Sequence, residues 1–380
     1  MHPFKKAARA AWGRALLVLA MATCWPALGP AAGPQDVPPK PPAGWWPDPC
    51  ARHVPPAEAI GSKRANVAVV IYDPKIEAEG GKKLSELMKW NDPRRLTREA
   101  IDSVRRASGG YVNYHVAKWV EIDGCPPFRS GFRYDDAGIV EAVRKARWIQ
   151  GDGSSYARIF EEAGLTRKFI DDFNLTEVWL WGSPGFHWDE YAMFIPDRAK
   201  RLPPTENPWF YRPYDVPDAG RTIWVMGWNY ERGLDCALES YAHRCEGILA
   251  LCQGNGRWDA KLAGKDPWST WSVCGEGAAA EIGCGNAHCP PNGQAGYDYA
   301  NRRTVTSFCE DWTRWPQVAG KLVRVDGTEW SRSHAEYLVW WMGHFSRNPG
   351  RTAWGWNNWW IYVANLDGNL SDEPCAVPRK

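Results

Sequence analysis

The chain has 380 residues, of which 44% are hydrophobic and 24% charged, a composition typical of a globular protein with a sizeable core. Its 46 basic and 44 acidic side chains leave a net charge of +2, so no basic excess points to nucleic acid or to an anionic membrane surface as a partner. Tryptophan is unusually frequent, with 25 residues against 11 phenylalanines. Because an indole combines a flat apolar face with one N–H donor, it suits stacking against rings.

Residues 1–32 are predicted to be a secretory signal peptide. Four basic residues within the first fourteen positions precede an apolar run from Ala15 to Trp25 and then small residues, which is the order typical of such peptides. That run is too short to span a membrane as a helix, and no later stretch is suited to doing so. A lipid anchor at Cys24 is the weaker alternative. We therefore expect a secreted or periplasmic protein without a membrane span.

Export also decides how the cysteines are interpreted. Removal of a signal peptide that contains Cys24 leaves ten of the eleven cysteines. An even number in an oxidising compartment favours disulfides over thiolate metal ligands. The sequence therefore predicts disulfides without naming the pairs.

Residues 33–64 are rich in proline and are predicted to form an extended linker. After the linker, apolar runs typical of strands alternate with helical patterns, which favours an α/β sheet with helices on its faces. In chain order we expect a strand at 66–73, a helix from Pro93 to a stop at Gly109-Gly110, a strand at 111–122, helical segments at 136–148 and 156–173, strands at 177–182 and 222–228, and a helix from Glu231.

The composition changes from about residue 254 onward. This part is rich in Gly, Trp, Asn, Pro and Cys, and its one clear predicted helix covers about 331–345. No flexible linker separates it from the preceding part. We therefore expect one α/β domain over residues 65–380, a mixed sheet with helices on its faces, whose C-terminal portion is loop-rich and stapled by disulfides.

The helix that begins near Glu231 carries Glu239, His243 and Glu246 at spacings of four and three residues. At roughly 100° per residue these side chains lie within about 60° of one another, beside an apolar face that enters the core. In one interpretation they are only a solvated acidic flank, with Glu239 and His243 as an i,i+4 pair. The helix directly follows a strand, however, so its first turn lies at the carboxyl end of the sheet, where α/β proteins bind ligands.

A histidine and a carboxylate one helical turn apart can share a cation. A further ligand must then come from another element, and His288 is the first candidate, in the Gly/Pro-rich loop "GCGNAHCPPN". We expect its imidazole to lie within reach of one ion or water shared with His243. The predicted ligands of one divalent metal, with zinc favoured, are therefore Glu239, His243 and His288, and Glu246 is the alternative to His288.

Five motifs stand out along the chain: "EVWLWG" at 177–182, "NYERG" at 229–233, ExxxHRxE at 239–246, CGNxHxPPN at 284–292 and "NNWW" at 357–360. Together they resemble a family of secreted bacterial proteins that has no assigned activity. The match covers most of the chain from residue 66 onward. Because that family carries no known activity, the resemblance implies nothing about chemistry.

A looser resemblance is to the zincin metallopeptidases, whose strand is followed by a helix carrying HExxH. Here the helix reads "ESYAHR", with Glu239 where the first histidine would stand and Ser240 where the general-base glutamate would stand. No third ligand follows at the spacing of the metzincins. A water-activating base would therefore have to come from another position, either Glu190 or Glu246.

Together these features favour a secreted hydrolase of an extracellular polymer, peptide or polysaccharide, that works by metal-assisted, peptidase-like hydrolysis. Glu190 or Glu246 would serve as the base, and Arg232 or Arg244 would steady an oxyanion. No GxSxG, Walker A or Rossmann glycine pattern is present, which disfavours serine-hydrolase, phosphate and dinucleotide chemistry.

Two other functions remain open. A metal-free glycoside hydrolase would use Glu190 and Glu239 as a carboxylate pair about 5–10 Å apart. In a less specific interpretation, Asp189 and Glu190 only cap a turn. A non-catalytic protein would instead hold a glycan or cell-wall polymer on exposed tryptophan side chains.

Overall fold

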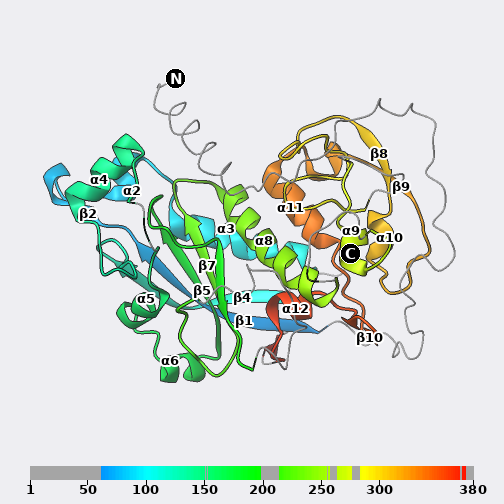
Figure 1. Ribbon diagram of the computed structural model, residues 1–380, viewed down its shortest axis with the longest axis horizontal. Helices are drawn as coiled ribbons and strands as arrows, with labels where there is room; N and C mark the ends of the chain where they lie inside the picture. The colour runs from blue at the N-terminus through cyan, green and yellow to red at the C-terminus, as the bar shows by residue number, and fades with distance from the viewer. Residues whose placement is uncertain are drawn as a thin grey trace.

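The computed structural model describes residues 61–149, 151, 153–197, 214–254, 256, 263–275, 283–368 and 370–373 (Figure 1). The predicted signal peptide and residues 33–60 of the predicted linker lie outside these ranges. Positions 62–64, also assigned to the linker, belong instead to the first strand. In the described ranges, no helix has both the length and the apolar character that crossing a membrane requires.

A mixed β-sheet with helices on both faces forms the centre of the fold, which confirms the predicted α/β class. Four parallel strands lie in the order β4 (Val112–Ile122), β1 (Ser62–Tyr72), β5 (Leu175–Gly182) and β7 (Ile223–Asn229). Antiparallel strands are β6 (Tyr191–Phe194), which extends the sheet beside β7, and β12 (Ser371–Glu373), which pairs with the first residues of β1. Because β5 is buried along its whole length, its sequence from Val178 onward is a continuous apolar run rather than an alternation.

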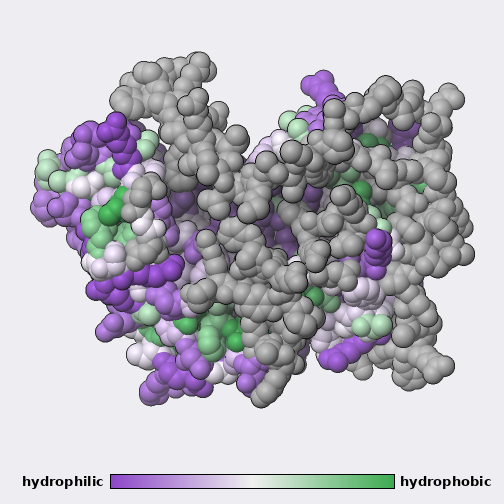
Figure 2. All heavy atoms as spheres, viewed as in Figure 1, coloured by the Kyte–Doolittle hydropathy of each residue, from purple (hydrophilic) through white to green (hydrophobic). Residues whose placement is uncertain are grey.

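Successive side chains of β1 point to opposite faces of the sheet and divide the core in two. The side chains at 67, 69 and 71 pack with α3 (Pro93–Ala107), α8 (Leu234–Cys252) and the C-terminal part. The side chains at 68, 70 and 72 pack with the helices of the other face. Those helices are α2 (Leu84–Met88), α4 (Asp136–Lys145), α5 (Tyr156–Glu162) and α6 (Arg167–Asp172). The outer surfaces of α4 and α6 are mostly hydrophilic (Figure 2).

Capping residues explain where several helices begin and end. Asp92 accepts a hydrogen bond from the backbone N–H of Arg94, and Pro93 occupies the first turn of α3, an arrangement that favours helix initiation. The helical segment predicted at 156–173 is instead two helices, α5 and α6. Gly164 lies between them and has a positive φ of 62°. A residue in this left-handed conformation ends a helix, so α5 stops before it.

The C-terminal part is loop-rich, as predicted, and packs on the α8 side of the sheet (Figure 1). Its helices are α9 (Pro267–Trp271), α10 (Cys309–Trp312), α11 (His334–Gly343) and α12 (Trp360–Ala364). Two small antiparallel sheets pair β8 (Thr304–Ser307) with β9 (Val323–Asp326) and β10 (Arg351–Thr352) with β11 (Gly355–Trp356). A hairpin, of β2 (Lys75–Ile76) and β3 (Lys82–Lys83), follows β1.

Buried tryptophans hold this part together. Trp268 and Trp271 stack with ring centroids 5.3 Å apart, and both rings contact Trp341 and Trp359. All twelve buried tryptophans of the described residues lie in the core on the α8 face of the sheet. In the core on the other face, the only described tryptophans are Trp90 and Trp188, which are partly buried. The burial of these large rings supplies the apolar area that a loop-rich segment otherwise lacks.

The predicted disulfide staples are not shown. No disulfide joins any two of the eight cysteines that the structure describes. Cys245, Cys284 and Cys309 are instead fully buried in the aromatic core, where a thiol behaves as a small apolar side chain. The prediction relied on an even number of cysteines. That number does not show that packing of aromatic side chains can stabilise a loop-rich segment in place of disulfides. Cys50 and Cys375 lie outside the described residues.

Candidate metal centre

Helix α8 is enclosed on nearly all sides. Thirteen of its 19 residues are buried, and the carboxylate-bearing side chains of Glu239 and Glu246 belong to residues only 8% and 7% exposed. The interpretation of these residues as a solvated acidic flank is therefore wrong. The periodicity of a single helix does not reveal that the loop around His288 and the start of α11 cover this flank.

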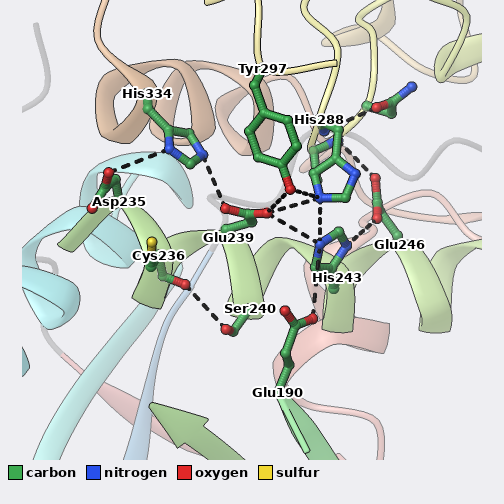
Figure 3. Close-up of polar contacts among 12 residues, drawn as sticks. Glu190, Asp235, Cys236, Glu239, Ser240, His243, Glu246, His288, Tyr297 and His334 are labelled. Atoms are coloured by element: carbon green, nitrogen blue, oxygen red, sulfur yellow. Dashed lines mark hydrogen bonds and ion pairs between the residues drawn. The ribbon is translucent and has the colours of Figure 1, made fainter. Parts of the chain in front are cut away.

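Three donor atoms converge beside α8 (Figure 3). His288 Nε2 lies 3.0 Å from His243 Nε2 and 2.9 Å from Glu239 Oε1, and the third side of this triangle, from His243 Nε2 to Glu239 Oε1, is 3.8 Å. The expectation that His288 and His243 lie within reach of one shared ion is thereby confirmed. These three residues form a group that could hold a metal ion.

The size of this triangle suits a metal ion. A triangle with sides of 3.0, 2.9 and 3.8 Å has a circumscribed circle with a radius of about 1.9 Å, so one point is equally close to all three atoms. Bonds from zinc to imidazole nitrogen and carboxylate oxygen measure roughly 2.0–2.2 Å. The three donor atoms could therefore hold such an ion at about bonding distance. We call Glu239, His243 and His288 the three-donor site.

Glu246 orients the ring of His243. Its Oε2 lies 2.7 Å from His243 Nδ1, and its Oε1 accepts a 2.8 Å hydrogen bond from the backbone N–H of Ala287. An N–H at Nδ1 pointing to the carboxylate leaves the lone pair of Nε2 for a metal, as in many carboxylate–histidine–zinc arrangements. Because Nδ1 and Nε2 are on different sides of the ring, Glu246 lies behind His243, away from the point shared by the three donors.

Glu190 approaches that point from another direction (Figure 3). It belongs to the segment between β5 and β6, and its backbone carbonyl accepts a hydrogen bond from the N–H of Gly227 on β7. Its Oε2 lies 3.9 Å from His243 Nε2, and its side chain is 53% exposed. Of the two carboxylates predicted as a base, Glu190 is the one that faces both the three-donor site and solvent.

Tyr297, which sequence reasoning missed, closes the site on its outer side. Its hydroxyl donates to Glu239 Oε1 at 2.8 Å and lies 3.1 Å from His288 Nε2. The residue is 56% exposed and has a positive φ of 66°, a backbone conformation that costs free energy outside glycine and is often found at functional sites. Its sequence surroundings, "GQAGYDY", resemble any polar loop and carry no signal of this role.

His334 and Asp235 lie at the far side of Glu239. His334 is the first residue of α11, and the side chain of Ser333 caps this helix. Its Nδ1 is 3.5 Å from Asp235 Oδ2, and its Nε2 is 3.6 Å from Glu239 Oε2. Its ring stacks on Tyr299 at a centroid distance of 4.3 Å and an angle of 8°. The sequence did not indicate His334, because nothing in it shows that α11 packs against α8.

The two arginines proposed to steady an oxyanion have different surroundings. Arg232 lies in the turn before α8 with a side chain 36% exposed, 3.9 Å from Glu231, and its charge acts on Glu239. Arg244 is fully buried and forms two 2.7 Å hydrogen bonds with Glu177 of β5. The prediction that Arg244 steadies an oxyanion is wrong, because the residue after His243 points about 100° away from it, into the core.

Comparisons of the chain with protein-family models, with curated proteins and with solved structures gave no match. The resemblances noted from the motifs therefore stay predictions.

The charges around the three-donor site favour a cation. Burial acts to lower the pKa of His243, but the charge of Glu190, the nearby carboxylate of Glu239 and the hydrogen bond with Glu246 outweigh it, so the pKa lies well above the ordinary value. Burial likewise acts to raise the pKa of Glu239, yet the nearby ring of His243 and the hydrogen bond with His288 hold it well below its usual range. A positive charge at Nε2 of His243 is thus stabilised by its neighbours.

Proposed function

We propose that this protein is a metal-dependent hydrolase in which Glu239, His243 and His288 bind one divalent cation, with zinc favoured. The convergence of the three donor atoms on one point within metal-bonding distance carries the proposal. Two histidines and one carboxylate, with a further position open to water, are a ligand set that catalytic zinc sites use. When bound, such an ion lowers the pKa of a coordinated water to about 7 and polarises a carbonyl oxygen.

The side chains around the three-donor site supply the remaining parts of a hydrolytic reaction. Glu190, half exposed and 3.9 Å from His243 Nε2, accepts the proton of the attacking water and returns it to the leaving group. The hydroxyl of Tyr297, which contacts Glu239, and the guanidinium of Arg232, whose charge acts on Glu239, are the proposed donors to a developing oxyanion. Glu246 keeps His243 in the correct tautomer and contacts no substrate.

The proposed substrate is an extracellular polymer with acyl linkages, a peptide in the first instance. The predicted signal peptide supports an extracellular substrate. The exposed side chains of Glu190 and Tyr297 border the three-donor site, and a chain that crosses it would contact both. Hydrolysis of an amide develops negative charge on the carbonyl oxygen, which a cation held by Glu239, His243 and His288 would stabilise.

The two alternative functions have less support. The described tryptophans are buried or partly buried, and none is among the exposed large hydrophobic residues, whereas a stacking platform for a glycan needs exposed rings. A metal-free carboxylate pair would need Glu239 available to substrate, but Tyr297 and His288 both contact its Oε1. The metal-dependent hydrolase therefore accounts for more of the arrangement.

Elemental analysis and a chelator test the proposed function. Purified protein should bind zinc stoichiometrically and should hydrolyse a library of unstructured peptides. A strong chelator should abolish the hydrolysis, and added zinc should restore it. Protein that binds no divalent metal after equilibrium dialysis, or hydrolysis that resists chelation, would end the proposal.

Replacement of Glu190 by glutamine should separate chemistry from metal binding. The amide keeps the size of the side chain but cannot accept the proton of water, so kcat should fall about 10²–10⁴-fold. Metal content should stay unchanged, because Glu190 is not among the three donors. Glu336→Gln, on the surface of α11 in an ion pair with Arg106, is the matched control and should keep full activity. A Glu190→Gln protein as active as this control would remove Glu190 from the mechanism.

A further inference from the structure

The carboxylate of Glu239 is contacted by histidines at both of its oxygens. Oε1 belongs to the three-donor site, whereas Oε2 points the other way and lies 3.6 Å from Nε2 of His334 (Figure 3). Atom Nε2 of His334 is buried and makes no hydrogen bond within the described part of the chain. A buried ring nitrogen aimed at a carboxylate without bonding to it is unfavourable, because a buried polar atom without a partner costs free energy.

The surroundings of His334 repeat those of His243. In each case a carboxylate from α8 lies near Nδ1, Glu246 at 2.7 Å and Asp235 at 3.5 Å, and in each case Nε2 faces Glu239. A carboxylate near Nδ1 leaves Nε2 as the metal-binding atom. Stacking on Tyr299 fixes the plane of the His334 ring. The ring of His334 is therefore oriented toward Glu239 in the same manner as the ring of His243.

The separation of 3.6 Å is too long for a hydrogen bond but suits two ligands of one ion. If the bonds from the ion to nitrogen and oxygen measure about 2.1 and 2.0 Å, this separation corresponds to an angle of about 120° at the ion, which lies close to tetrahedral coordination. We propose that Glu239 bridges two divalent cations, the first in the three-donor site and the second between Glu239 Oε2 and His334 Nε2.

The second cation has two protein ligands in this arrangement, so water or substrate fills its other positions. It should therefore bind more weakly than the first. In sites with two metals about 3.5–4 Å apart, the ions together stabilise the attacking and the leaving group. The second cation would add this capacity to the proposed hydrolase, and it would also explain why α11 places a histidine against a carboxylate that already belongs to another site.

Metal stoichiometry tests this proposal. The full-length protein is dialysed to equilibrium against a series of zinc concentrations, and bound zinc is measured by elemental analysis. Two equivalents should bind in two steps. His334→Ala should retain the first equivalent and lose the second, and His115→Ala, on β4 and outside this centre, should bind two as the unaltered protein does.

The possible outcomes separate the second cation from the first. One equivalent at saturating zinc, lost on His243→Ala, would overturn the second cation and leave the proposed function standing. Two equivalents in both the unaltered protein and His334→Ala would overturn the placement at His334. No bound zinc at all would overturn both proposals. The first equivalent also serves as a control for folding. If His334→Ala still binds it with unchanged affinity, the variant is folded, and loss of the second equivalent reports on the second site alone.

Discussion

Replacement of His243 by alanine is expected to abolish both metal binding and hydrolysis. The substitution removes one of three donors and leaves only Glu239 and His288, 2.9 Å apart, to hold the ion. Changes behind a ligand typically cost 10–100-fold in metal affinity, so loss of the ligand itself should cost more than about 100-fold. Bound zinc, measured after dialysis at a concentration that fills only the first equivalent of the unaltered protein, should fall below detection, and peptide hydrolysis should fall with it.

Glu246→Gln provides the graded companion to this variant. The amide can still contact His243 but no longer carries the charge that orients Nδ1–H, so metal affinity should fall by about 10–100-fold and be recovered at high zinc. His115→Ala should change nothing. A His243→Ala protein with unaltered zinc content and activity would contradict the assignment of His243 as a ligand.

The second large effect concerns stability. Arg244→Met should lower the free energy of unfolding by about 3–5 kcal/mol, because it leaves Glu177 as an unpaired charge in the core. Glu177 and Arg244 are fully buried and joined by two hydrogen bonds, and Arg244 also donates to the backbone carbonyl of Val363 in α12 at 2.5 Å. Urea unfolding followed by far-ultraviolet circular dichroism measures the change.

Two further variants identify the cause of that loss. Adding Glu177→Gln to Arg244→Met removes the buried charge but keeps an acceptor for Tyr114, which donates to Glu177 Oε1 at 2.6 Å, so part of the stability should return. Arg106→Met breaks the exposed pair with Glu336 and should cost no more than about 1 kcal/mol. If Arg244→Met lowered the free energy of unfolding no more than Arg106→Met does, the buried pair would contribute no more to stability than an exposed one.

The sheet was predictable because its strands carry strong local signals. The apolar run at 66–73 and the alternating run at 111–122 correspond to β1 and β4, and Pro93 marks the start of α3. The short strand β12 was not predictable, because its three residues, "SDE", are polar and are extended only by pairing with the start of β1. Propensity does not record a partner so distant in the chain.

The candidate site likewise has residues that the sequence predicted and residues that it did not. Glu239, His243 and Glu246 share one helix, so their spacing alone placed them together, and His288 followed from the search for a further ligand in a loop rich in glycine and proline. Tyr297 and His334 could not be found by this route, because each reaches Glu239 through the packing of a loop or of α11 against α8. Which element covers a helix is decided by tertiary packing, which the periodicity of that helix does not encode.

The distribution of tryptophan between the two cores has an optical consequence. Among the described residues, Trp268, Trp271 and the other buried indoles all lie on the α8 face of the sheet, shielded from water. Their fluorescence should therefore be emitted at short wavelength and resist quenching by iodide. Loosening of that layer should shift the emission to the red, whereas loosening of the layer that contains α4, α5 and α6 should leave most of it unchanged. Tryptophan fluorescence should therefore report the structural integrity of the layer that contains the proposed metal centre.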